Sequence, residues 1–130
     1  ISLSCDRFAC RANALLTRFC SLREEPGALR PPNAMAHDWR QESGWNWAFP
    51  PLRDIPRVLA LVREQRARAV ILVPDWQQHW SSAARRAALE VIPLPGDEPL
   101  FRCLRDGQWQ EVQQFLFRPL LLVVDGSVSQ

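Results

Sequence analysis

The 130-residue sequence contains no lysine and no tyrosine, so all 16 of its basic residues are arginine. Arg, Ala and Pro use GC-rich codons, and the base composition of the source genome is one explanation of this bias. The other explanation is functional, because the planar guanidinium group of arginine suits phosphate binding better than the ammonium group of lysine does. The formal net charge of +2 is too small to identify a nucleic-acid-binding protein by itself.

Metal-binding motifs and long apolar runs are also missing. The four cysteines lack the C-x-x-C spacing of a zinc site, and the two histidines, His37 and His79, are far apart. The first residues lack the continuous apolar core of a secretory signal, and no run approaches the ~20 residues of a membrane span. We therefore expect a cytoplasmic or nuclear protein with reduced thiols that binds neither a metal nor a membrane.

The length fits one domain over residues 1–130. The chain begins with Ile, inside a segment that has the pattern of a strand, so we expect a fragment of a longer protein. Residues 24–43 are polar and show no periodicity, which predicts a long loop. The C-terminal part, residues 96–130, is hard to assign: residues 111–117 fit a helix or a strand, and residues 119–125 favour a strand.

The most regular pattern lies in the centre of the chain. The apolar run 45–49 predicts a strand that stops at Pro50, because proline cannot donate to a sheet ladder. Asp54 is placed to cap an amphipathic helix of about fourteen residues. The run 69–73 then predicts a strand buried on both faces. This order of elements predicts a βαβ unit with parallel strands.

Shorter elements are expected on either side of this unit. Residues 1–5 are predicted to form a strand that ends at Asp6, residues 9–19 a short helix, residues 81–89 another helix, and residues 89–94 another strand. Together these elements predict an α/β fold, namely an incomplete Rossmann-like three-layer sandwich with a mostly parallel sheet and helices on both faces.

Candidate site residues follow the predicted strands, where ligands bind in an open parallel sheet. Asp6 and Phe8 follow the first strand, and Pro50 and Pro51 follow the central one. We expect them to lie along one edge of the sheet. A structural explanation stays open for each, because a proline pair also makes a stiff turn between strand and helix, and Asp6 is equally typical of a turn or a cap.

Nucleic-acid contacts are a separate possibility. Trp76 and Trp80 lie just past the third predicted strand and are the best candidates for stacking on bases, although tryptophans more often form core or cleft walls. Arg66 and Arg68 belong to the arginine cluster that could bind phosphate. The sequence has no Gly-rich phosphate loop and no nucleophile elbow, so hydrolase chemistry is not favoured.

Several segments, in this order, resemble the part that follows the reverse transcriptase and ribonuclease H domains in polyproteins of DIRS-type (tyrosine-recombinase) retroelements. The segments are DRFACRANALLTRFCS, DW, AFPPLRDIPRVLALVREQRARAVILVPDWQQHW and PLLLVVDG. The residues that fit the family's pattern are Asp6, Phe8, Ala9, Asn13, Asp38, Trp39, Phe49, Pro50, Pro51, Ile55, Pro56, Val58, Leu59, Pro74, Trp76 and Trp80. The resemblance covers most of residues 1–80.

The same part of the chain is similar to Dam-type phage adenine methyltransferases. The resemblance implies a methyltransferase-like fold, with S-adenosylmethionine bound near Asp6, Phe8 and Asp38. It places Pro50 and Pro51 in the catalytic motif.

The residues on either side of that proline pair depart from the enzyme pattern. In the enzymes, an Asn or Asp before the prolines accepts a hydrogen bond from the amine of a flipped base, and an aromatic residue after them stacks on the base. Here Phe49 stands before the prolines and has no hydrogen-bond acceptor, and Leu52 stands after them and has no π face.

Three functions stay open. We expect the first, a retroelement-derived methyltransferase-like module that is not an enzyme on its own and reaches nucleic acid through its parent reverse transcriptase/ribonuclease H polyprotein. The second is an S-adenosylmethionine-dependent DNA adenine-N6 methyltransferase in which Asn46 or Asp75 accepts the amine hydrogen bond. The third is a nucleic-acid-binding appendage whose arginines bind phosphate and whose tryptophans stack on bases.

Overall fold

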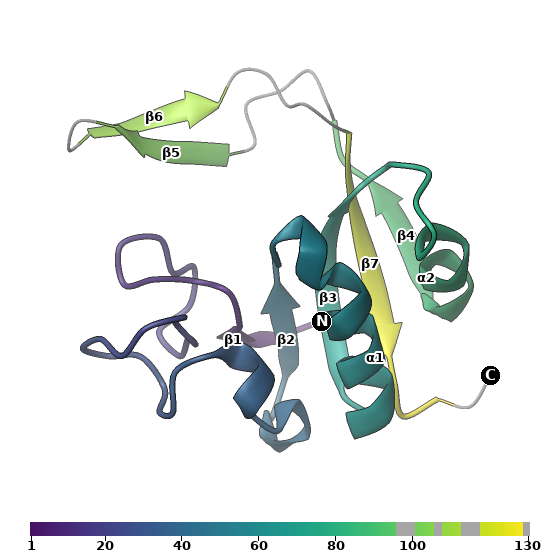
Figure 1. The fold of residues 1–130 in the computed structure, drawn as a ribbon, viewed down its shortest axis with the longest axis horizontal. Helices are drawn as coiled ribbons and strands as arrows, with labels where there is room; N and C mark the ends of the chain where they lie inside the picture. Colours follow the sequence, from purple (N-terminus) through teal and green to yellow (C-terminus); the bar gives the residue numbers. More distant parts are fainter. Residues whose placement is uncertain (96–100, 106–107, 113–117, 129–130) are drawn as a thin grey trace.

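The computed structural model describes residues 1–95, 101–105, 108–112 and 118–128 (Figure 1). The strands are β1 (Leu3–Asp6), β2 (Trp45–Ala48), β3 (Arg68–Pro74), β4 (Glu90–Pro93), β5 (Phe101–Arg105), β6 (Gln108–Val112) and β7 (Pro119–Asp125). The helices are α1 (Ile55–Gln65) and α2 (Ser81–Ala87), and the 3-10 turns are η1 (Ala34–Ala36), η2 (Trp39–Gln41) and η3 (Leu52–Asp54).

The fold is α/β and is built on a five-stranded mixed sheet of order β1-β2-β3-β7-β4. β1, β2 and β3 are parallel neighbours, which confirms the central βαβ unit. β7 is antiparallel to both β3 and β4, so the sheet is mixed and the prediction of a mostly parallel sheet is not confirmed. An apolar run buries its side chains equally well in either direction, and β7 begins at Pro119, beside Pro74 at the carboxyl end of β3. The β5-β6 hairpin stands apart from this sheet in Figure 1.

Both helices cover the same face of the sheet. Strand register places Ile71 of β3 beside Leu122 of β7, and these residues belong to one buried cluster with Val58 and Val62 of α1 and Ala84 of α2. The parallel strands advance across the sheet in one direction, and right-handed connections then keep their helices on one side. The expectation of helices on both faces is therefore wrong for the described residues.

Helix α1 follows from its local sequence but is shorter than predicted. Ile55, Val58 and Val62 form its buried face, as their spacing requires. It ends at Arg66, which takes a left-handed conformation with φ 54° and donates its N–H to the Arg63 carbonyl. Asp54 occupies the N-cap position, but its side chain makes no capping hydrogen bond.

Residues 9–19 form turns and bends, so the helix expected there is wrong. The segment folds back beside the edge strand β1: the Asp6 N–H donates to the Arg18 carbonyl, and the Cys20 N–H donates to the Asp6 carbonyl. The Leu15 N–H also donates to the Asp6 carboxylate at 3.0 Å. Backbone hydrogen bonds and the Asp6 carboxylate therefore hold this returning segment beside β1.

The polar loop at residues 24–43 is anchored to the core. Trp39 at the start of η2 is buried, and its indole N–H donates to the Ala34 carbonyl at 3.0 Å. Its backbone N–H donates to the side chain of Gln65 on α1 at 2.8 Å. One aromatic residue thus ties an otherwise aperiodic loop to the helix side of the sheet. Within the described ranges, no helix has the length and apolar character needed to cross a membrane.

Candidate functional site

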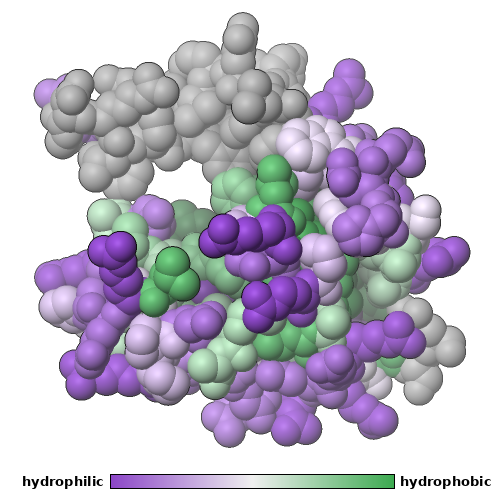
Figure 2. Space-filling view, viewed as in Figure 1, coloured by the Kyte–Doolittle hydropathy of each residue, from purple (hydrophilic) through white to green (hydrophobic). Residues whose placement is uncertain are grey.

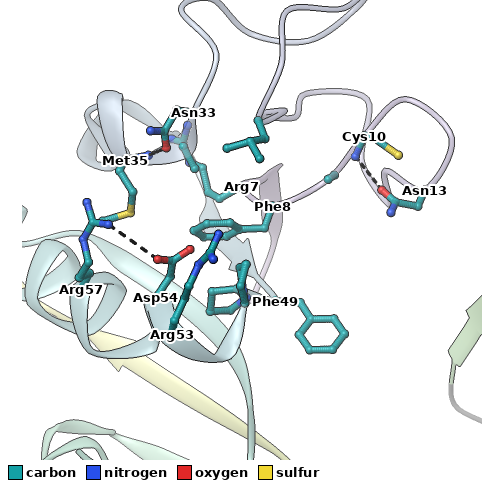
Figure 3. A pocket seen from close by; sticks show the side chains of 15 residues that line it. Arg7, Phe8, Cys10, Asn13, Asn33, Met35, Phe49, Arg53, Asp54 and Arg57 are labelled. Carbon is teal, nitrogen blue, oxygen red and sulfur yellow. Dashed lines mark hydrogen bonds and ion pairs between the residues drawn. The ribbon is translucent and has the colours of Figure 1, made fainter.

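A cleft of about 880 Å³ lies at the carboxyl ends of β1 and β2. Phe8 follows β1, Pro50 and Pro51 follow β2, and the wall opposite comes from η1 in the long loop and from the start of α1 (Figure 3). Clefts of roughly 300–1,000 Å³ accommodate ligands of nucleoside size. The volume and its position at the strand ends make this cleft the candidate site.

The apolar part of the cleft is held in place by the core beneath it. The Phe8 ring packs edge-on against Trp39, with 6.2 Å between ring centroids, and it points into the middle of the cleft in Figure 3. Met35 and the ring of Pro50 also line this space. Because Trp39 is buried and hydrogen-bonded, Phe8 has a fixed support, and a planar ligand ring could lie against it.

The guanidinium group of Arg7 forms part of the floor. Its Nε donates to the Asn46 side-chain oxygen at 2.7 Å, and its Nη1 donates to the Cys20 sulfur at 3.2 Å. It lies 5.3 Å from the ring centre of Trp39, and its Nη2 is 4.0 Å from the Glu42 carboxylate. Arg7 is only 2% exposed, so its charge is used inside the protein.

Two buried thiols and a carboxylate complete this network. Cys5 and Cys20 are hydrogen-bonded to each other, and this contact together with burial raises the pKa of Cys5. The same hydrogen bond and the guanidinium group of Arg7 lower the pKa of Cys20. Glu42 accepts hydrogen bonds from Arg18 on both oxygens at 2.9 Å. The floor of the cleft is therefore rigid and electrostatically compensated.

Acceptor groups in the cleft already have partners. The Asn13 oxygen accepts from the Cys10 N–H at 2.7 Å, and the Asn33 oxygen accepts from the Met35 N–H at 3.0 Å. The carboxylate of Asp54 lies 3.7 Å from the guanidinium group of Arg57, which is the dashed contact in Figure 3. None of these three acceptor residues stands at the position before the proline pair, which Phe49 occupies.

The two residues that could have replaced the missing acceptor are engaged elsewhere. Asn46 is fully buried, accepts from Arg7, and donates to the Trp39 and Arg68 carbonyls at 2.9 Å. Asp75 accepts from Arg85 at 2.6 Å and lies outside the cleft lining. Neither one offers an oxygen in the cleft.

The predicted catalytic remnant and one predicted cofactor residue meet in this cleft. Phe8, Pro50 and Pro51 all line it. Phe49 also lines it and is 40% exposed, whereas Leu52 stands next to the cleft on η3 with 46% exposure.

Asp6 and Asp38, the other two predicted cofactor residues, lie outside the cleft lining. Asp6 is buried, its Oδ1 has no hydrogen-bond partner among the described residues, and burial raises its pKa. Asp38 caps η2 by accepting from the Arg40 N–H at 3.0 Å, and its contacts with Arg40 hold its pKa below the usual value. In this structure both carboxylates serve the local backbone.

The four predicted nucleic-acid contacts are divided between opposite ends of β3. Trp76 and Trp80 follow its carboxyl end and lie beside α2 in a shallow depression separate from the cleft. Arg66 and Arg68 lie at its amino end, about 20 Å away for a strand of this length. The guanidinium group of Arg68 stacks over Trp45 at 5.4 Å. The structure therefore does not bring these four residues together.

Sequence reasoning missed the basic side of the cleft. Arg53 and Arg57 line it from η3 and the first turn of α1. The sequence contained a signal for them. Both arginines follow the proline pair, and they are four residues apart, a spacing that places them on one side of a helix. Within the described ranges, no group of three or more His, Cys, Asp or Glu residues could hold a metal ion.

No family model matches the sequence, and neither a curated protein nor a solved structure matches it.

Proposed function

We propose that this domain is a non-catalytic, methyltransferase-like module that binds a nucleoside-containing ligand in the cleft at the carboxyl ends of β1 and β2. The observation that carries the proposal is the meeting of Phe8 with Pro50 and Pro51 in one space of nucleoside size. The resemblance to DIRS-type polyproteins suggests S-adenosylmethionine as the first ligand to test, and a reverse transcriptase/ribonuclease H polyprotein as the molecular context.

The lack of catalysis follows from the surroundings of the proline pair. Phe49 stands where a methyltransferase needs an acceptor, and the oxygens of Asn13, Asn33 and Asp54 in the cleft are already paired. None of these three paired residues stands at the position before the proline pair, where the enzymes have the acceptor that is aligned in advance with the amine. We also propose that the fold is an incomplete Rossmann-like one, because helices cover only one face of the described sheet.

Calorimetric titration of the domain with S-adenosylmethionine tests ligand binding. Phe8→Leu keeps an apolar contact with Trp39 but removes the ring, so it should weaken binding about ten-fold if a ligand ring stacks there. Leu89→Ala, at an exposed position away from the cleft, is the matched control and should bind like the wild type. Equal affinity of wild type and Phe8→Leu would exclude the cleft as the binding site.

A second assay tests the absence of chemistry. The domain is incubated with radiolabelled S-adenosylmethionine and unmethylated DNA, and label in the DNA is counted against a working adenine methyltransferase. We expect no transfer above background. Transfer that persists in Phe49→Ala, and disappears in Phe8→Leu, would show an active enzyme and overturn the non-catalytic part of the proposal.

A further inference from the structure

The side chains that line the cleft carry more positive than negative charge, and arginine supplies the positive charge. Arg53 makes no ion pair with any described residue. Within the described part of the chain, Arg57 is paired only with Asp54, at 3.7 Å, and its side chain is 68% exposed. Asp54 is the one carboxylate among the described residues that line the cleft. The lining therefore has two solvent-facing guanidinium groups and one carboxylate, which is paired with Arg57.

The remaining cation of the lining, Arg7, adds little to this charge, because Glu42 stands 4.0 Å from its guanidinium group. An ion pair as exposed as that of Arg57 and Asp54 contributes at most ~1 kcal/mol, so Arg57 can turn towards a better anion at little cost. Figure 2 shows hydrophilic side chains over α1 with hydrophobic ones directly beside them. The cleft thus combines an apolar wall with a cationic rim.

We infer that the cleft accepts a nucleoside phosphate, with the phosphate bound by Arg53 and Arg57 and the base lying against Phe8. Guanidinium groups bind phosphate through paired, charge-assisted hydrogen bonds, and the apolar wall offers the planar base a surface. S-adenosylmethionine is net cationic, because its sulfonium and ammonium groups outnumber its carboxylate, so the rim disfavours it relative to an anionic nucleotide. This inference rests on the proposed function, which places a nucleoside-containing ligand in the cleft, and it adds that the ligand is anionic.

The nucleoside phosphate is either a free nucleotide or one residue of a single strand. Three probes separate these two sources: adenosine, adenosine 5′-monophosphate and an eight-residue deoxyadenosine strand. The nucleotide should bind about ten-fold or more tightly than adenosine, as expected for charge-assisted hydrogen bonds to one phosphate. Tighter binding of the strand than of the nucleotide would identify a strand as the source, and equal binding would identify a free nucleotide.

The double variant Arg53→Gln/Arg57→Gln should bring the affinity for the nucleotide down to that for adenosine. Arg63→Gln is the matched control, because Arg63 is an exposed arginine of the same helix at its other end, outside the cleft. A loss of equal size in Arg63→Gln would show a non-specific charge effect and overturn the inference. Thermal unfolding of each variant checks that the fold is kept.

The failures of the two proposals can be told apart. Binding of S-adenosylmethionine without binding of the nucleotide, or equal binding of adenosine and nucleotide, would overturn the inference and leave the proposed ligand cleft standing. Binding of the nucleotide without S-adenosylmethionine would support the inference and remove S-adenosylmethionine as a ligand. No binding of any probe by folded protein would overturn both.

Discussion

Replacing Arg7 by methionine tests the buried network beneath the cleft. The substitution keeps much of the aliphatic volume and removes a guanidinium group that is hydrogen-bonded to Asn46 and Cys20 and faces Glu42. Breaking a buried ion pair by removing one partner costs about 3 to 5 kcal/mol. Glu42 keeps its two hydrogen bonds from Arg18, which places the expected loss near the lower end of this range.

We therefore expect Arg7→Met to lower the free energy of unfolding by about 3 kcal/mol, measured by urea denaturation followed by tryptophan fluorescence. For a chain of this size, that loss corresponds to a fall of about 12 °C in Tm. The control is Arg30→Gln, which breaks an exposed pair with Glu24 and should cost less than about 1 kcal/mol.

A double variant isolates the ion pair. Arg7→Met combined with Glu42→Gln should be less destabilised than the sum of the two single variants, because the second change removes the charge that the first leaves without a partner. A loss below about 1 kcal/mol in Arg7→Met, with an unchanged denaturant slope, would refute the view that this network holds β1 to the long loop.

Burial raises the pKa of Asp6 in the folded state, so its contribution to stability is present below the unfolded pKa and is lost as pH rises through the folded pKa. Asp6→Asn should therefore be more stable relative to wild type at pH 7 than at pH 4 by urea denaturation, and a pH-independent difference would contradict this cause. A Cβ added at Gly126 would overlap the Val62 carbonyl oxygen and lie 3.0 Å from that of Ala67. Gly126→Ala should thus lower the free energy of unfolding by about 1 to 3 kcal/mol, and an unchanged midpoint would show that the chain end moves freely away from α1.

The candidate site was predictable only where its residues are fixed by strand ends. The prediction that residues after the first two strands share one edge holds for Phe8 and the proline pair. It does not extend to Asp6, whose carboxylate is used to bind the returning segment at Leu15. Asp6 is the last residue of β1 and Phe8 lies beyond it, so strand alternation does not relate the two side chains, and only the fold of the following turn places Phe8 in the cleft.

The contribution of the long loop could not be read from its sequence. Residues 24–43 have no periodicity, and yet they supply Asn33 and Met35 to the cleft and Trp39 to the core. These contacts depend on segments far apart in the chain, and local pattern contains no information about such partners. The burial of Arg7 was hidden for the same reason, because its partners come from β2 and from the segments around residues 20 and 42.

The sequence by itself determined the elements β2, α1 and β3, their parallel pairing, and the strand β7, since the period and length of apolar runs specify what must be buried. Only the tertiary structure decided that β7 runs antiparallel between β3 and β4, that both helices lie on one face, and that a cleft with a basic rim opens at the strand ends. Burial fixes which residues turn inward. The direction of a strand and the partners of a side chain follow from how distant segments are connected and packed.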